Sequence, residues 1–476
     1  MKLKYFHISI LACLCFHVVQ AQTNANAYTL KSAIELALAN NVTIKQADLK
    51  TSGAKENARQ ASFNRLPSIS AGLNYGINNG RSIDPFTNSY NNQQLSSSNG
   101  NITASLPLFQ GFRNQAAIQQ NSLSYKAAGL EAQQSRDNLA LDVAQAFLQV
   151  LSNEDQLNLL KKQASVTDSQ VARLTLLNQE GAIAPPLLAD LKGQYASDQV
   201  SVLNAENALQ SAKLSLATLM NIDYKKEMIL SRKGLDMTPI PYGETAIKVY
   251  EAAIEKMALV KAVDLRTSAA MKGIKLASAD YYPTVSLFGQ LNSNYSSLAR
   301  TLTAASISEV PSGDFVNIGT SKVPVFTRQT DYNSSKIGYV RQLSNNFNTY
   351  FGISLQVPIF SGFQARTKVS LARLEAKNAG FIAADTRRQL KQSVDKAYLD
   401  MQTAFERLNL LQQQVNEFRE SFRAAGIRFE LGSIHAVEYL TVKTNLDRAE
   451  VNLSVARYEY LLRTKVLDFY QGNINW

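Results

Sequence analysis

The chain has 476 residues, and its 49 Lys and Arg residues outnumber 38 Asp and Glu residues, giving a formal net charge of +11. Both cysteines, Cys13 and Cys15, and two of the three histidines lie in the first 21 residues. Without that segment the chain has no cysteine and a single histidine, His435. This composition excludes disulfide frameworks, cysteine-ligated zinc sites, thiol nucleophiles and pairs of catalytic histidines. We therefore do not expect an enzyme, and the sequence assigns no catalytic residue, cofactor or metal ligand.

Residues 1–21 have the pattern of a signal peptide. Lys2 and Lys4 form a positive end, residues 6–19 are an uncharged apolar run, and Ala21 supplies a small residue at the cleavage position. Attachment of a lipid at Cys13 is the second interpretation, because it would leave a shorter apolar run. No later segment has about 18 consecutive uncharged apolar residues, so no transmembrane helix is expected. In an exported chain, we interpret the excess positive charge as solvated helix surface rather than a nucleic-acid site.

The chain contains one pattern twice. The sequence LPLFQGF at 106–112 recurs as VPIFSGF at 357–363, an offset of 251 residues. Upstream, Pro67 and Pro283 match at an offset of 216, so the second copy contains a 35-residue insertion between Pro283 and Pro358. Repetition of this kind predicts two copies of one structural unit.

Each repeat is predicted to contain a helix, two strands joined by a polar loop, a long helix, a turn and a further helix. In the first repeat, 22–243, these are a helix over 29–66, a β-hairpin over 67–108, a long helix over 111–179, a helix over 186–220 and an equatorial linker over 221–243. In the second, 244–476, they are a helix over 244–282, a β-hairpin over 283–359 with a long loop over 295–346, a long helix over 362–431 and a helix over 435–470. The long loop has no readable structure. Two shorter helices placed end to end match one long helix, so the linker and both termini are expected at mid-height.

The two long helices carry a heptad repeat typical of coiled coils. In the first, the two heptad positions hold Val143, Val150, Leu157, Ala164 and Val171, and Ala146, Asn153, Leu160, Thr167 and Leu174. At the offset of 251 they hold Val394, Met401, Leu408, Val415 and Phe422, and Ala397, Ala404, Leu411, Phe418 and Ala425. A helix of this length forms a rod of roughly 100 Å, which needs packing partners along its whole length.

Four segments alternate apolar and polar side chains, as strands with one lipid face and one wet face do. They are 69–77, 102–108, 285–292 and 351–357, and Phe288 is an exception on the polar side. A soluble hairpin packed on a helix would be the preferred interpretation for one hairpin, but two hairpins joined to long rods in an exported chain favour the membrane. Four strands do not close a membrane barrel, and an open strand edge in lipid is very costly. The chain is therefore expected to oligomerise.

With these features the sequence resembles the TolC-like outer-membrane efflux family. The resemblance covers nearly the whole mature chain and rests on LKSAIELALANN at 30–41, on the junctions 106–109 and 357–360, and on Gly181 and Gly432. It implies an α+β membrane protein that forms a homotrimer, with a 12-stranded outer-membrane β-barrel, four strands per chain, and a long periplasmic α-helical barrel of coiled-coil helices. It also implies two partners, a periplasmic adaptor (membrane fusion protein) and an inner-membrane transporter of RND or ABC type.

The turns that follow the two long helices are the first candidate site. Glycine suits a left-handed helix stop, Pro186 suits a first helical turn, and Ser433 is expected to cap the next helix. Turn chemistry alone explains these residue types, and His435 is interpreted as a turn residue. The resemblance implies that the turns contact the adaptor. The candidate adaptor-binding residues are Gly181, Ala182, Ile183, Gly432, Ser433 and Ile434.

A pore constriction is the second candidate site. Members of the resembled family often carry acidic residues six and nine positions after the second tip glycine. Here these positions hold Glu438 and Thr441, and the first repeat offers Asp190. A ring of Glu438 carboxylates, joined by Asp190, would favour cations. Pairing of the acid with nearby Lys443 or Lys192 on a solvated surface is an equal alternative.

The expected function is a passive exit duct in the outer membrane, with its helical barrel in the periplasm. It would serve a tripartite efflux pump or a type I secretion system and export small molecules or proteins. A surface-anchored helical rod with a structural or adhesive role is the alternative. The sequence indicates neither the cargo nor the role of the loop 295–346.

Overall fold

The computed structural model describes residues 27–235 and 238–473, so the expected signal peptide lies outside the described residues. The chain forms two compact units. One contains the segments up to Ala54, Ser124–Thr267 and from Asn378 onward, and the other contains Lys55–Leu123 and Ser268–Lys377. Each unit takes segments from both sequence repeats. The units are therefore built by pairing equivalent parts of the repeats, and neither unit corresponds to a single repeat.

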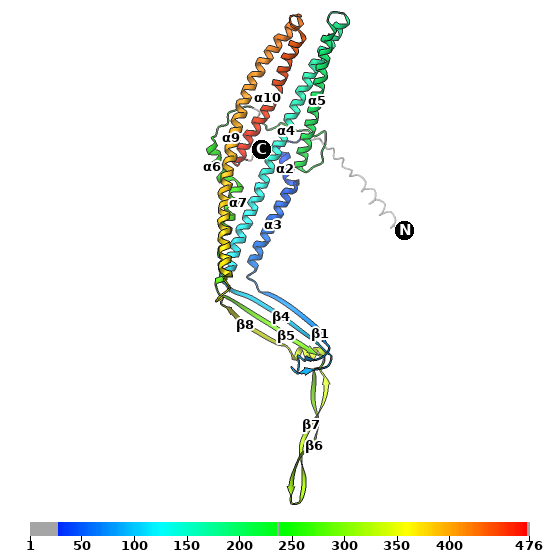
Figure 1. The fold of residues 1–476 in the computed structure, drawn as a ribbon, viewed down its shortest axis with the longest axis vertical. Helices are drawn as coiled ribbons and strands as arrows, with labels where there is room; N and C mark the ends of the chain where they lie inside the picture. Colours follow the sequence, from blue (N-terminus) through cyan, green and yellow to red (C-terminus); the bar gives the residue numbers. More distant parts are fainter. Residues whose placement is uncertain (1–26, 236–237, 474–476) are drawn as a thin grey trace, which may run out of the picture. The chain divides into compact units, whose positions relative to one another are not determined.

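Helices make up the first unit and extend into the second. They are α2 (Leu30–Asn40), α3 (Val42–Phe63), α4 (Arg113–Gln179), α5 (Pro185–Met220), α6 (Ala246–Lys256), α7 (Ala258–Ser278), α9 (Gln364–Glu430) and α10 (Ala436–Tyr470). In Figure 1, α5 runs beside α4 and α10 runs beside α9. Within the described segments, no helix combines the length and apolar character needed to cross a membrane.

The single helices expected over 29–66 and 244–282 are each divided in two. The first is interrupted at Asn41 and the second at Met257, where both residues have extended backbone angles. These positions are related by the repeat offset of 216. The Asn41 side chain accepts a hydrogen bond from the Thr43 N–H (2.8 Å) and donates one to the Leu219 carbonyl (3.1 Å), so it caps the new helix start. Met257 has no such polar group and is instead held by burial in the core.

The heptad residues form the core of the helical unit, as expected. Val143, Val150, Val394 and Val415 are at most 1% exposed. They belong to two apolar clusters, one centred on α4 and α5 and the other on α9 and α10. Each long helix therefore packs mainly with the helices of its own repeat.

The linker at residues 221–243 contacts both ends of the described chain. The Tyr28 N–H donates to the Ile229 carbonyl (2.9 Å), and the Tyr28 carbonyl accepts from Ser231 (2.8 Å). Near the other end, the Tyr242 hydroxyl contacts Asp468 at 3.4 Å. The gathering of linker and chain ends expected from helix lengths is therefore present within the helical unit.

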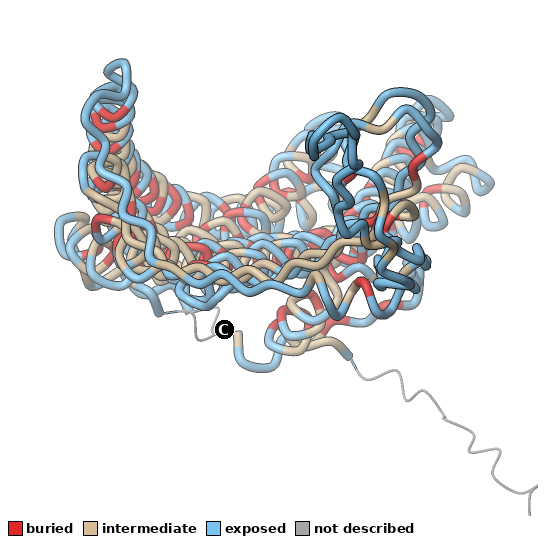
Figure 2. Tube along the Cα trace, turned by 90° about the horizontal axis from the view of Figure 1, so that it is seen from below, coloured by how far each residue is buried: buried red, intermediate tan, exposed pale blue. Residues whose placement is uncertain are grey.

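The second unit contains one four-stranded antiparallel sheet. Its strands are β1 (Ser68–Asn78), β4 (Leu95–Gln110), β5 (Thr284–Ser296) and β8 (Asn348–Gln356), in the spatial order β1-β4-β5-β8. The edge strands β1 and β8 each have a single neighbour in this sheet. Apolar residues of both edges are exposed, including Ile69, Leu73 and Phe351 at 72% each. Figure 2 shows this contrast, with buried positions recurring along the helices and few along the strands.

The pairing of β5 with the edge strand β8 contains two reciprocal aromatic–glycine pairs. Phe288 lies opposite Gly352, and Gly289 lies opposite Phe351. A Cβ added to Gly352 would come within 2.8 Å of the Phe288 ring, and one added to Gly289 would come equally close to the Phe351 ring. Each glycine therefore provides the space for a ring on the neighbouring strand. This explains Phe288, which broke the polar alternation of its strand in the sequence.

The repeated LPLFQGF and VPIFSGF motifs form the strand-to-helix junctions. Gly111 and Phe112 both have left-handed backbone angles (φ 58° and 63°), and so do Gly362 and Phe363 (φ 57° and 62°). Two left-handed residues in succession redirect the chain sharply into α4 and α9. In each junction the phenylalanine packs edge to face on the preceding one, with ring centroids 5.4 Å apart in the first and 5.7 Å in the second.

The segment 295–346, for which the sequence predicted a loop without regular structure, is folded. It forms a second antiparallel hairpin, β6 (Arg300–Ile318) with β7 (Ser321–Lys336), followed by the short helix α8 (Tyr339–Asn345). In the first repeat, the corresponding loop contains only two short strands, β2 (Ser82–Ile83) and β3 (Tyr90–Asn91). Most of the insertion therefore forms this hairpin. The short 3₁₀ turn Ala279–Tyr281 completes the described elements.

Candidate functional site: the two helix tips

The two tips are the turns that join α4 to α5 and α9 to α10. Gly181 and Gly432 have left-handed backbone angles (φ 72° and 69°), which favour glycine. In each tip the next residue donates its N–H five residues back, from Ala182 to the Leu177 carbonyl and from Ser433 to the Arg428 carbonyl, both at 2.8 Å. This is the Schellman helix stop. The repeat thus preserves the turn down to individual hydrogen bonds.

The helices that follow the tips begin differently. Pro185 and Pro186 occupy the first turn of α5, as the sequence indicated. The expectation that Ser433 caps the next helix is wrong. That helix, α10, begins at Ala436, and His435 occupies the cap position without a side-chain hydrogen bond to the backbone. Ser433 is too far upstream, because a side-chain cap must lie directly before the first helical residue.

Only part of the candidate adaptor surface is accessible in the single chain. Gly181, Ala182, Gly432 and Ser433 are exposed, and Ile183 is half-buried. Ile434, in contrast, is 7% exposed and packs in a small apolar cluster with neighbouring residues of α9 and α10. The exposed part of each tip is therefore a small glycine-containing loop with an isoleucine behind it.

A cavity of about 470 Å³ lies between the tips. Its apolar lining includes Leu174, Leu177 and Phe429, and its polar lining includes Asp190 and His435. Ile183 and Ile434 also line it, so the structure brings residues of both tips to one place. Phe429 packs with the apolar clusters of both tips, which links the two repeats here.

Glu438, the other constriction candidate, does not line this cavity. It forms an ion pair with Arg428 on the preceding helix, with Nη1 and Oε1 3.2 Å apart, and its side chain is 52% exposed. The suggested pairing with Lys443 is wrong, because Lys443 is buried and bound to other carboxylates. An exposed pair of this kind is worth at most about 1 kcal/mol.

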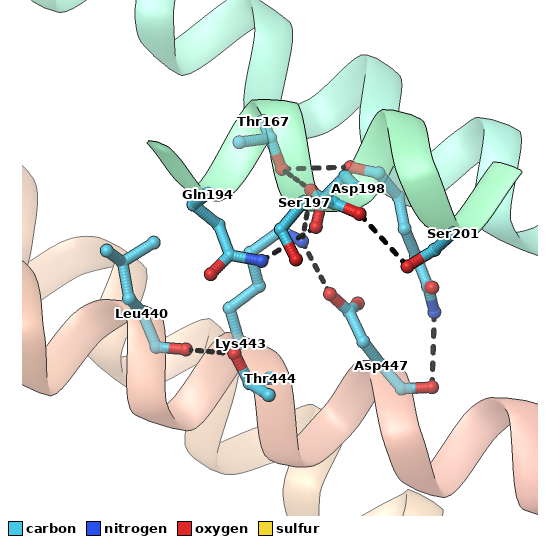
Figure 3. A network of polar contacts seen from close by, with 10 residues as sticks. Thr167, Gln194, Ser197, Asp198, Ser201, Leu440, Lys443, Thr444 and Asp447 are labelled. Atoms are coloured by element: carbon cyan, nitrogen blue, oxygen red, sulfur yellow. Dashed lines mark hydrogen bonds and ion pairs between the residues drawn. The ribbon is translucent and has the colours of Figure 1, made fainter. Parts of the chain in front are cut away.

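Lys443 forms a buried polar network that the sequence analysis did not assign (Figure 3). Its side chain on α10 is 4% exposed and forms an ion pair with Asp447 one turn along. Its ammonium nitrogen also lies 3.6 Å from an oxygen of Asp198 on α5. The network therefore joins the helix pair of one repeat to that of the other.

Neutral side chains complete this network. Thr167 on α4, 1% exposed, donates its hydroxyl to Asp198. The Gln194 amide donates to the other Asp198 oxygen at 2.7 Å, and the Gln163 amide donates to the Asp447 carbonyl at 3.3 Å. The sequence did carry a signal. Asp198 is spaced by seven residues from the buried Leu191 and Ala205, so a charge occupies a heptad core position.

Burial raises the pKa of the Asp447 carboxyl, because desolvation outweighs the hydrogen bond and the charge of Lys443. A carboxyl whose pKa is raised on folding contributes stability below its unfolded pKa and loses that contribution as pH rises through the folded value. Folding therefore favours the protonated form of Asp447, and the Lys443 charge partly offsets this effect. Among the residues that the structure describes, no group of three or more acidic or histidine side chains is arranged to hold a metal ion.

The fold and the paired tips define a class of outer-membrane channel proteins, and the chain belongs to the outer membrane efflux protein family. The family model matches residues 33–221 and 249–473. The gap between the two matched segments falls in and just after the linker. The matched segments therefore coincide closely with the two sequence repeats.

Individual relatives are distant in sequence and similar in structure. Outer membrane protein TolC of Escherichia coli K12 is 22% identical over 455 residues, 95% of this chain and 83% of that protein. The CmeC outer membrane channel of Campylobacter jejuni has a TM-score of 0.74 at 15% identity, over 93% of this chain and 85% of that one. The outer membrane protein VceC of Vibrio cholerae has a TM-score of 0.71 at 16% identity, over 93% and 96% of the two chains. These solved structures share the fold of this chain.

Replacing Lys443 with alanine should destabilise the helical unit by up to about 3 kcal/mol, because it leaves two partly buried carboxylates without their cation. Thermal or denaturant unfolding followed by circular dichroism measures this. The loss should shrink in mildly acidic solution, where protonated Asp447 no longer needs a positive partner. Lys192→Ala, on the exposed surface of α5, is the control and should change stability by about 0.5 kcal/mol or less. Equal effects of the two variants would show that the buried network is not stabilising.

Proposed function

We propose that this chain is the outer-membrane exit duct of a tripartite efflux pump or a type I secretion system. It acts as a passive conduit that carries small molecules or proteins from an inner-membrane transporter to the exterior. Membership of the outer membrane efflux protein family supports this function, and so does the shared fold of the CmeC and VceC channels. The single observation that carries the proposal is the sheet with two open edges.

The open edges require further copies of the chain. Strands β1 and β8 each leave one side of their backbone unpaired within the sheet, and in lipid every backbone polar group needs a partner. Pairing β8 of one copy with β1 of the next satisfies both edges at once. With three copies, the number typical of this family, the result is a barrel of twelve strands. The exposed apolar side chains of the sheet then face lipid.

Exposed apolar residues along α9 support contacts between copies in the helical part as well. Phe381, Leu399 and Leu410 are 62–66% exposed in the single chain. Apolar side chains repeated along one long helix are typical of a surface that packs on another helix. In the proposed homotrimer, these helices form an α-helical barrel of twelve helices that projects into the periplasm and continues the duct.

The tips are the proposed contact with the periplasmic adaptor, through Gly181, Ala182, Ile183, Gly432, Ser433 and Ile434. The exposed glycine loops leave open space around each Cα, since a Cβ at Gly181 or Gly432 would meet no atom within 4 Å. A partner helix could therefore approach the backbone closely. The inner-membrane transporter, of RND or ABC type, would supply the energy that a passive conduit lacks.

The proposed pore constriction consists of Glu438 with Asp190. Asp190 lines the cavity between the tips, whereas Glu438 is held by Arg428. In an assembled channel, exposed carboxylates near the closed end would raise the local concentration of cations. The Arg428 pair would weaken that effect without abolishing it, because the pair is half-exposed.

The protein purified in detergent should be an oligomer, and native mass spectrometry should give the mass of three chains. Added to planar lipid bilayers, it should produce discrete ion-conducting steps. A structural or adhesive rod would not conduct ions, whether or not it forms an oligomer. A monomer, or an oligomer without conductance even after its tips are removed, would refute the exit-duct proposal.

Gly432→Arg should abolish export while the channel still assembles, because arginine is strained at a left-handed position and fills the space the adaptor would occupy. The readout is cargo export in cells, with trimer recovery from outer membranes as the measure of assembly. The matched control is Gly426→Arg, on α9, where φ is helical and a Cβ also meets no atom within 4 Å. Normal export by the Gly432→Arg variant would show that this tip does not contact the adaptor.

Glu438→Ala should reduce the preference for cations over anions, by about twofold or more, if its carboxylate contributes to the constriction. Reversal potentials in a salt gradient measure the ratio. Glu227→Ala, in the exposed linker, is the control and should leave the ratio unchanged. A ratio unchanged in Glu438→Ala would reject its role at the constriction.

A further inference from the structure

The helix ends that adjoin the four-stranded sheet carry most of the net positive charge of the chain. Helices α3 and α7 lead into β1 and β5, and β4 and β8 lead into α4 and α9, so four helix ends meet the same end of the sheet (Figure 1). We call them the basic helix ends, and they comprise the segments 55–67, 111–123, 268–283 and 357–377, all in the unit that contains the sheet. They hold ten Lys and Arg residues and three Asp and Glu residues, a net charge of +7.

The rest of the long helices has the opposite charge. The segments 137–220 and 392–470 hold 15 Lys and Arg residues and 20 Asp and Glu residues, a net charge of −5. The four strands β1, β4, β5 and β8 contain no charged residue. The positive charge is therefore not spread evenly over the helix surface, as the composition suggested. It is concentrated directly beside an uncharged sheet.

Exposed rings lie between the uncharged sheet and the cations. Phe63, at the end of α3, is 52% exposed, and Phe112, at the start of α4, is 63% exposed. Phe360 and Phe363, in the turn that enters α9, are 77% and 62% exposed. Aromatic side chains at the ends of membrane strands are typical of the boundary between the hydrocarbon of a bilayer and its headgroups.

The acidic residues of the basic helix ends neutralise only part of their charge. Glu56 forms an ion pair with Arg59, with Oε1 and Nη1 2.9 Å apart. Asp280 forms ion pairs with both Arg113 and Lys368, and the Lys368 ammonium lies 2.7 Å from Asp280 Oδ2. One carboxylate thus serves two cations at the start of α4 and α9, and one positive charge remains there.

Three further cations beside the sheet are exposed. Arg65 lies between α3 and β1, Lys275 lies in the last turn of α7, and Arg366 lies in the first turn of α9. None of the three has an ion-pair partner among residues 27–235 and 238–473. Charges interact over roughly 8 Å at physiological ionic strength. Cations this near the sheet are therefore the ones that would act on groups at its border.

We propose that the basic helix ends bind the phosphate groups of anionic phospholipids in the leaflet that borders the helices. This inference rests on the proposed function, because it takes the sheet to lie in the membrane. The order of uncharged sheet, exposed rings and cations then matches the order of hydrocarbon, headgroup boundary and phosphate. Clusters of basic residues directly beside a membrane segment are typical of sites for anionic lipids. A soluble polyanion would require neither the rings nor the position beside the sheet.

Lipid binding by the full-length oligomer in detergent tests the proposal. Native mass spectrometry compares phosphatidylglycerol, which is anionic, with phosphatidylcholine of the same acyl chains, which has no net charge. The wild-type protein should bind phosphatidylglycerol at least about fivefold more tightly, since each basic residue near an anionic surface contributes about that factor. Added salt should weaken this preference. The combined variant Arg65→Gln, Lys275→Gln and Arg366→Gln should lose most of it.

The matched control replaces Lys162, Lys192 and Lys225 with glutamine, which removes the same charge from exposed positions of the other unit. The control should keep the wild-type lipid preference. Equal binding of the two lipids by the wild-type protein, or an equal loss of preference in both variants, would overturn the proposal. So would a combined variant that keeps its lipid preference but changes the ion selectivity of the channel, because its cations would then face the water-filled bore.

The outcomes separate the lipid site from the proposed function. The same spectra give the number of chains in each particle, and a monomer would contradict the proposed duct. An oligomer that conducts ions in planar bilayers but binds both lipids equally would contradict the lipid site alone. Because the replaced cations are exposed, circular dichroism should show wild-type helix content in both variants.

Discussion

The backbone hydrogen bonds of the two edge strands are the constraint on which the rest of this molecule depends. A sheet of four strands presents one unpaired side at β1 and another at β8, and a bilayer offers these groups no water. The proposed self-association therefore has its physical reason in the sheet itself. The proposal also accounts for the exposed apolar residues of the long helices, because copies that meet at the strands would also bring their helices together.

Much of the fold could be predicted from the sequence because the chain repeats itself. Residues related by the offset of 251 occupy equivalent places in α4 and α9, and Gly181 and Gly432 make the same turn. The helix interruption at Asn41 and Met257 could not be predicted in the same way, since Met257 is a good helix former held in place by tertiary burial. The structure of the insertion could not be predicted from the sequence either. Its strands are exposed on both sides in the single chain, and the extra residue between Ala304 and Ser306 shifts the alternation that identifies a strand.

The candidate site was predictable in location and less so in detail. The glycines and prolines predicted the position of both tips. The cap at His435 depends on the exact residue at which α10 begins, and a sequence-based assignment of a helix start is accurate only to within a residue or two. The sequence analysis missed the Lys443 network because a lysine side chain is normally expected to be exposed to solvent. Its partner Asp447 lies one turn along the same helix, a spacing that is also common on exposed helix surfaces. The second partner, Asp198, lies on a helix from the other repeat, and pairing across such a long separation is not visible in the sequence.

The phenylalanine rings that sit over glycines between β5 and β8 have a consequence for assembly. A shift of this pairing by one residue would place Phe288 opposite Phe351 or Ile353 instead of Gly352, and the ring would lose the space that the glycine provides. In the proposed ring of subunits, a register slip inside one copy would displace its β8 edge relative to the β1 edge of the next copy. The two glycines would thus favour the strand register in which the proposed barrel can close.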